Sequence, residues 1–172
     1  MEAIENRKLF LRLTPKEIWM VVLLTLAIGA VGWLLPGRFD IVVSDSLDHR
    51  IFFLCEPPTM FDTGDYLVFR AKEIKFLQKS LTRKDLFTKQ VGCKPGDLLT
   101  VDGERRFSCN GRPLGQALEA DSEGNRLPEF RFNGVIPQGS YFAVGSNPRS
   151  FDSKYIGFIK KDEILYKAYP IW

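Results

Sequence analysis

The chain has 172 residues, 45% of them hydrophobic and 13% aromatic, and its formal net charge is +3. This length leaves room for one domain with an appendage, and the apolar content excludes an intrinsically disordered protein. The 24 basic residues are interleaved with 21 acidic ones and form no long run of one sign, so we expect no nucleic-acid partner.

The first predicted element is an uncharged apolar run at residues 18–35, IWMVVLLTLAIGAVGWLL. As a helix it would be about 27 Å long, close to the ~30 Å thickness of a bilayer core. Trp19 and Trp33 lie near its ends, as side chains at a membrane interface do, and Pro36 and Gly37 follow directly. The run predicts a single transmembrane helix in contact with the lipid bilayer. The alternative is a cleaved secretory signal, but the run is long for one and is preceded by acidic residues.

Basic residues flank this predicted helix unequally. Four precede it within the first 17 residues, whereas Arg38 and Arg50 are the first to follow. By the positive-inside rule, residues 1–17 form a cytoplasmic segment and residues 36–172 form a domain on the outer side of the membrane. We therefore expect three parts: this segment, the anchor at 18–35 and the outward domain.

The outward domain is predicted to be mainly β and antiparallel. Short apolar runs are separated by turn sequences such as Gly64-Asp65, Asp102-Gly103 and Asn110-Gly111. Eight runs are predicted as strands: DIVVS, RIFFLC, DYLVFRA, DLLTVDG, RRFSCNG, SYFAVG, YIGFIKK and EILYKAYPI.

Two stretches depart from this β pattern. In Ala71–Phe87 the apolar residues Ile74, Leu77 and Leu81 share one helical face, which predicts a short amphipathic helix, either an insert or a segment that contacts lipid headgroups. The stretch 113–134 is rich in Gly, Asp and Asn and is predicted as a loop. We find no glycine motif for phosphate and no zinc-type Cys/His spacing, and we expect no metal and no cofactor.

The three cysteines suggest one disulfide. Cys93 and Cys109 lie on either side of the predicted hairpin DLLTVDGERRF, at a spacing that paired strands can bring together. An outward compartment would allow the two thiols to oxidise. We expect this bond to form and Cys55 to remain free.

The stretch VSDSLDHR, residues 43–50, contains two serines, two aspartates and the only histidine of the chain. These are the parts of a hydrolytic triad, but residues three apart in a strand lie about 10 Å apart on opposite faces, so Ser46 and His49 could meet only across a tight turn. Triads are also normally assembled from distant parts of the chain. We interpret His49 as a polar turn or surface residue and keep the triad as the alternative.

A serine nucleophile can instead use a lysine whose charged form is disfavoured by burial. Lys89 is the best candidate, because it lies in TKQVGCKPGDLLTV among apolar residues that would desolvate an amine. The alternative is a solvated lysine, which is the more common case among strands.

An ordered set of motifs resembles the signal peptidase I superfamily of membrane-anchored Ser/Lys proteases, and most closely its TraF-type conjugative-transfer peptidases. The resemblance covers nearly the whole chain and would give it a signal-peptidase-like β fold. After the anchor come four boxes: Ser44-Asp45-Ser46-Leu47, Gly64-Asp65-Tyr66-Leu67-Val68-Phe69, Lys89-Gln90-Val91-Gly92-Cys93-Lys94-Pro95-Gly96-Asp97, and Gly145-Ser146-Asn147 through Ser150-Phe151-Asp152-Ser153-Lys154-Tyr155-Ile156-Gly157.

Four positions depart from the pattern of the superfamily. The usual proline two residues after the nucleophile is Asp48, and the arginine after the base is Gln90. The acidic residue of the Gly-Asp-Asn triplet is Ser146, and the arginine of the last box is Lys154. None of them removes the Ser/Lys dyad, and they fit the transfer branch better than the general signal peptidase.

The resemblance implies a role for each matching residue. Ser46 would attack the scissile carbonyl while neutral Lys89 accepts its proton. The backbone N–H of Ser46 and the hydroxyl of Ser44 would stabilise the oxyanion. Ser150 would hold the Lys89 amine.

Two charged residues of the last box have an implied supporting role. Asp152 and Lys154 would form an ion pair that positions Ser150. The alternative is that both are solvated surface charges.

The implied function is removal of the leader of an exported protein, a conjugative pilin precursor, on the periplasmic side of the bacterial inner membrane. The cut pilin would either remain linear, by hydrolysis, or have its new end joined to its own N-terminus, which gives a ring. Other conjugative transfer proteins are implied as partners. The alternatives are a general signal peptidase and a non-enzymatic scaffold for pilus assembly.

Overall fold

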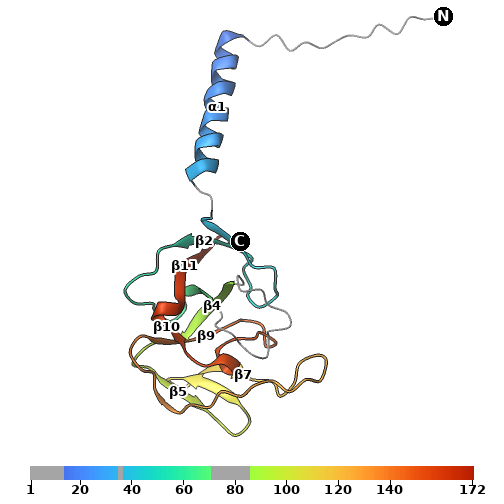
Figure 1. Cartoon of the computed structure of the whole chain (residues 1–172), viewed down its shortest axis with the longest axis vertical. Coiled ribbons are helices and arrows are strands. Elements are labelled where there is room, and N and C mark those ends of the chain that lie inside the picture. The colour runs from blue at the N-terminus through green and yellow to red at the C-terminus, as the bar shows by residue number, and fades with distance from the viewer. Residues whose placement is uncertain (1–13, 35–36, 71–85) are drawn as a thin grey trace, which may run out of the picture. The chain divides into compact units, whose positions relative to one another are not determined.

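The computed structural model describes residues 14–34, 37–70 and 86–172, and the chain divides into two compact units, Met1–Pro36 and Gly37–Trp172 (Figure 1). The first unit contains helix α1 (Pro15–Leu34), which begins at Pro15 rather than at the predicted Ile18. The Glu17 carboxylate accepts a hydrogen bond from the Thr14 N–H at 2.6 Å, and the Thr14 hydroxyl accepts one from the Glu17 N–H at 3.4 Å. This capping box explains the earlier start.

Helix α1 covers most of the run at residues 18–35 that was predicted as a transmembrane anchor. Within 14–34 and the other described residues, no helix is both long and apolar enough to cross a membrane.

The second unit is built from antiparallel strands, which confirms the predicted mainly β class. Among the described residues they form a seven-stranded sheet of order β1-β2-β11-β3-β4-β9-β10 and a four-stranded sheet of order β7-β6-β5-β8. The elements are β1 (Phe39–Ile41), β2 (Ile51–Cys55), β3 (Tyr66–Arg70), β4 (Leu86–Cys93), β5 (Leu98–Val101), β6 (Arg106–Cys109), β7 (Arg112–Gln116), β8 (Gly134–Val135), β9 (Ser140–Val144), α2 (Ser153–Ile156), β10 (Ile159–Lys160), the 3-10 helix η1 (Lys161–Glu163) and β11 (Ile164–Pro170).

The predicted helix at Ala71–Phe87 is wrong at its end. Leu86 and Phe87 open β4, where they pair with Arg70 and Phe69 of β3. This pairing is a tertiary contact that overrides the helical spacing of the preceding residues. The rest of the predicted insert, residues 71–85, lies outside the described residues.

Two further predictions need correction. The stretch 113–134 is not a loop throughout, because its first residues belong to β7, which pairs with β6, and its last residue opens β8. The run YIGFIKK is not one strand either, since α2 ends within it at Ile156 and β10 begins at Ile159. Gly157, with φ of 78°, separates the two and adopts a conformation that favours glycine.

The two sheets share a hydrophobic core and a covalent link. Phe142 of β9 stacks on Phe107 of β6, with their ring centroids 5.2 Å apart. A disulfide joins Cys93, the last residue of β4, to Cys109, the last residue of β6, and both are buried. Cys55 is a free cysteine.

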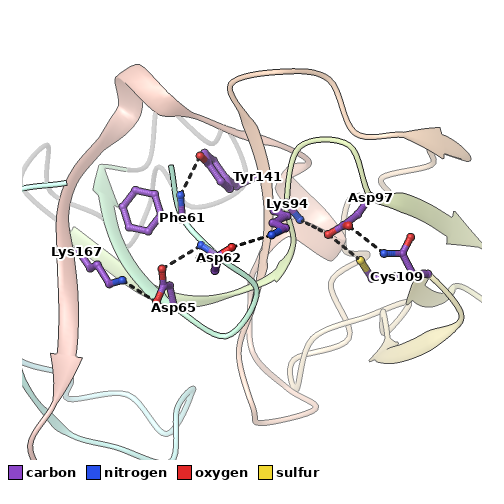
Figure 2. A network of polar contacts seen from close by, with 9 residues as sticks. Phe61, Asp62, Asp65, Lys94, Asp97, Cys109, Tyr141 and Lys167 are labelled. Carbon is purple, nitrogen blue, oxygen red and sulfur yellow. Dashed lines mark hydrogen bonds and ion pairs between the residues drawn. The ribbon is translucent and has the colours of Figure 1, made fainter. Parts of the chain in front are cut away.

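Polar contacts fix the turn that follows β4, as Figure 2 shows. The Asp97 carboxylate accepts a hydrogen bond from the Lys94 N–H at 3.0 Å, and the Lys94 ammonium contacts Asp62 at 2.7 Å. Asp65 accepts from the Asp62 N–H at 3.0 Å and pairs with Lys167 of β11 at 2.8 Å. The end of β4 is thus tied both to the second sheet and to β11.

Removing the disulfide should destabilise this unit. The two cysteines are 16 residues apart, and in the chain-entropy model a loop of this length contributes about 3 kcal/mol. Cys93→Ser combined with Cys109→Ser should lower the free energy of unfolding by that amount in a denaturant titration. Cys55→Ser is the matched control and should change it little. Three reactive thiols in the unreduced, denatured protein would show that the bond does not form.

Candidate active site

The loop between β1 and β2 carries the predicted nucleophile. The Val42 N–H donates to the Arg50 carbonyl at 2.8 Å and closes this loop, which we call the nucleophile loop, residues 43–49. Ser46 is 9% exposed, and its hydroxyl lies 2.9 Å from that of Ser44. The next residue, Leu47, is buried in a cluster with Phe52 and Val68, among others. The buried leucine anchors the loop and leaves the serine hydroxyl at the edge of the core.

Lys89 enters the site from β4, where it lies opposite Leu67 of β3. It is 3% exposed, and its ammonium nitrogen donates a hydrogen bond to the Ser150 hydroxyl at 2.8 Å. Burial lowers the pKa of Lys89 from 10.5 to about 8; the charge of Asp152 opposes this shift and that of Lys154 adds to it. A substantial fraction of the amine is therefore neutral just above neutral pH.

A buried ion pair supports the segment that carries Ser150. Lys154 contacts the Asp152 carboxylate at 2.7 Å, and the two side chains are 2% and 0% exposed. The same carboxylate accepts hydrogen bonds from the N–H groups of Lys154 and Gly145, so it caps α2 and also fixes the residue after β9. These two residues are therefore not solvated surface charges.

Gly145 lies where the nucleophile loop meets the Ser150 segment. A Cβ at this position would be 2.1 Å from the Ser150 hydroxyl oxygen and 2.5 Å from the Ser46 carbonyl oxygen. Only glycine leaves the backbone room to pass between them.

These elements enclose a cleft with a volume of about 750 Å³. Its walls come from β1 and the nucleophile loop, from the first half of β4, and from the segment before α2. The lining residues are Asp40, Ile41, Val42, Val43, Ser44, Asp45, Ser46, Leu86, Phe87, Thr88, Lys89, Asn147, Arg149, Ser150 and Phe151.

The cleft brings together most of the residues that the sequence singles out. Ser44, Ser46, Lys89 and Ser150 all line it, although they come from three separate parts of the chain. Within the part of the chain that the structure describes, His49 is not one of the residues that line the cleft. Its ring instead packs edge-on against two other rings, those of Phe52 and Tyr66.

Other site residues were not predicted. The Asp40 carboxylate accepts a hydrogen bond from the Thr88 hydroxyl at 2.6 Å and so joins β1 to β4 across the cleft. The only sequence signal was their place at the ends of apolar runs, which does not show that they meet.

Cys93, Asp97 and Cys109 also lie close together, but both sulfurs are in the disulfide and cannot bind a metal as thiolates.

Comparison with known proteins shows the family of the chain. The family model described as signal peptidase, peptidase S26, matches residues 18–172. The chain therefore belongs to the signal peptidase family, whose members are serine peptidases that act on exported preproteins. A comparison with curated proteins gives no match.

Proposed function

We propose that the chain is a Ser/Lys endopeptidase in which Ser46 is the nucleophile and Lys89 the general base. The observation that carries this proposal is the burial of Lys89, which lowers its pKa to about 8 in the cleft that also contains the Ser46 hydroxyl. A base must be largely neutral at the working pH, and an ordinary exposed lysine is not. The family match supports serine peptidase activity, which needs a nucleophile and a base of this kind.

In this mechanism the Ser46 oxygen attacks the scissile carbonyl carbon and the Lys89 amine accepts the hydroxyl proton. The resulting ammonium then gives the proton to the leaving amine, and an acyl-enzyme on Ser46 remains. Ser150 holds the amine through the 2.8 Å hydrogen bond. The Ser46 hydroxyl is hydrogen-bonded to that of Ser44 at 2.9 Å, and a Ser46–Lys89 hydrogen bond would form in the substrate complex.

We further propose that the substrate is the precursor of a conjugative pilin, processed outside the cytoplasm. The disulfide supports this compartment, because disulfides persist mainly under oxidising conditions. Where a leader is removed, the leader is the acyl group on Ser46, water releases it, and the pilin departs as the leaving amine. Where a C-terminal segment is removed, the pilin is the acyl group, and either water releases it as a linear chain or its own N-terminal amine displaces Ser46 and closes a ring. The pilin assignment comes from the motif resemblance.

Co-expression with a candidate prepilin tests the proposal. Cleavage would appear as a shift of the pilin band on a gel, and Ser46→Ala should abolish the shift. A non-enzymatic scaffold would leave the precursor intact. Processing of unrelated secretory precursors would favour a general signal peptidase. Mass spectrometry of the product separates hydrolysis from cyclisation, since a linear pilin is one water heavier than a ring.

Ser44→Ala should slow cleavage without changing the fold. The Ser44 hydroxyl lies 2.9 Å from the Ser46 hydroxyl, close enough to donate to the oxyanion that forms on the substrate. Loss of one such donor costs roughly a hundredfold in kcat. Ser108→Ala is the matched control, because it removes a serine from a similar hydroxyl pair in the second sheet, at 2.7 Å from Thr100. Equal rates for the two variants would exclude the oxyanion role of Ser44.

The rate of cleavage should rise with pH and level off above a midpoint of about 8. Lys89 acts as the neutral amine, and its pKa is lowered to about 8, so the active fraction increases through that pH. An essential histidine would instead give a limb near its ordinary pKa of about 6.5. A pH–rate profile of kcat/KM checks this. A midpoint near 6.5 that disappears in His49→Ala would restore the triad interpretation.

A further inference from the structure

The nucleophile loop is linked to the Ser150 segment by a hydrogen bond between side chains far apart in the sequence. The Ser146 hydroxyl donates to the Asp48 carboxylate at 2.9 Å. Asp48 lies two residues after Ser46, and Ser146 lies four residues before Ser150. The bond therefore joins the segment with the nucleophile to the segment that contacts the base.

Two backbone contacts also join these segments. The Asn147 N–H donates to the Ser46 carbonyl at 3.4 Å, which is a long hydrogen bond. The backbone of Gly145 packs closely against the same carbonyl, because a Cβ added there would lie 2.5 Å from its oxygen. Neither contact resists a sliding movement as well as a short hydrogen bond does. At 2.9 Å, the Asp48–Ser146 hydrogen bond is shorter than the 3.4 Å bond from Asn147 to Ser46.

The carboxylate of Asp48 is available for this role. The other acidic residue of the nucleophile loop, Asp45, pairs with Arg50.

We propose that Asp48 and Ser146 are a pair of positioning residues whose hydrogen bond fixes Ser46 relative to Lys89. This inference rests on the proposed Ser/Lys mechanism. Each of the two residues provides the hydrogen-bond partner of the other. Loss of the bond would let the nucleophile loop shift against β4, and small displacements of a nucleophile lower the rate of the chemical step more than substrate binding.

Steady-state kinetics on a defined probe tests the pair. The probe is a quenched fluorescent peptide with an Ala-x-Ala sequence before the scissile bond, because secretory leaders are typically cut after small residues in this spacing. The full-length enzyme is used. Asp48→Leu and Ser146→Ala should each lower kcat by about three- to tenfold, the worth of one hydrogen bond, with KM unchanged. The double variant should be no slower than the slower single variant, because both remove the same bond.

Two rescue variants separate the hydrogen bond from charge. Asp48→Asn keeps an acceptor oxygen and should retain a kcat within about twofold of the wild type. Exchange of the two residues, Asp48→Ser with Ser146→Asp, rebuilds the bond with the partners reversed and should recover most of the loss. Glu129→Leu, which removes an exposed carboxylate that pairs with Arg131, is the control and should leave kcat unchanged.

Several outcomes would overturn the pair. Equal losses in Asp48→Asn and Asp48→Leu would assign the effect to charge, and additive losses in the double variant would show that the two residues act independently. A lower unfolding temperature with unchanged kcat would make the bond merely structural. If Ser46→Ala still cleaves the peptide, the proposed mechanism itself is wrong, which is a different result from a failure of the pair.

Discussion

Lys89→Met should abolish cleavage and, near neutral pH, stabilise the folded protein. The first effect follows from loss of the base that accepts the Ser46 proton. The second follows from the pKa of Lys89, which is about 8 in the folded state and 10.5 when the side chain is free in solution. Because the folded state holds this proton less tightly, keeping the lysine charged in its buried position opposes folding.

The expected gain depends on pH in a defined way. Below pH 8 the lysine is charged in both states, so the full cost, about 3 kcal/mol at about 1.4 kcal/mol per pH unit, is relieved by methionine. Between pH 8 and 10.5 the cost falls, and above 10.5 it vanishes because both states are neutral. Denaturant titrations of both proteins at pH 7 and pH 11 measure the difference. A lysine retained for stability would give the opposite sign.

Matched variants show whether the loss of cleavage is specific. Lys160 also donates to a serine hydroxyl, that of Ser140 at 2.7 Å, but Lys160 is an exposed residue. Lys160→Met should therefore retain cleavage, and so should His49→Ala. Ser46→Ala should be as inactive as Lys89→Met, because the two residues act as one unit. An active Lys89→Met with an inactive His49→Ala would reverse the assignment of the base.

The sequence predicts the β class and the main residues of the cleft for separate reasons. Short apolar runs with glycine and asparagine turns are local signals, and β2, β3, β5 and β6 follow them closely. Ser46 and Lys89 were selected by motif and by chemistry, and the burial that the mechanism needs came from the apolar neighbours of Lys89. The β class and the main cleft residues are therefore indicated by short stretches of the sequence.

The remaining features depend on contacts that no short stretch contains. Leu86 and Phe87 become strand because β3 lies beside them, and β7 forms despite Pro113 and Gly115 because β6 pairs with it. Helix α2 spans only Ser153–Ile156, too short for a periodic signal, and its capping residue Asp152 is held in place by the Gly145 N–H directly after β9. Local spacing in the sequence does not predict these elements, because they form through contacts with residues far away in the chain.

The Gly145 contact is a further case of this kind, and it gives the second large effect: Gly145→Ala should lower kcat by roughly a hundredfold or more. The new Cβ would lie 2.1 Å from the Ser150 hydroxyl oxygen and 2.5 Å from the Ser46 carbonyl oxygen, so something must move. A rotation of Ser150 would break its hydrogen bond to Lys89, and a shift of the Ser46 backbone would move the nucleophile. A displacement of about 1 Å is enough for a loss of this size.

The matched control for this substitution is Gly103→Ala, because a Cβ there meets no atom within 4 Å. Gly103→Ala should keep the wild-type kcat and unfolding temperature, so that any loss in Gly145→Ala reflects the site and not alanine as such. The pH–rate profile adds a second measurement. If alanine displaces Ser150, the Lys89 amine loses the hydroxyl that receives its hydrogen bond, and the midpoint near pH 8 should move. Wild-type kcat with an unmoved midpoint in Gly145→Ala would show that the two segments separate without cost, and that their close contact does not position the nucleophile.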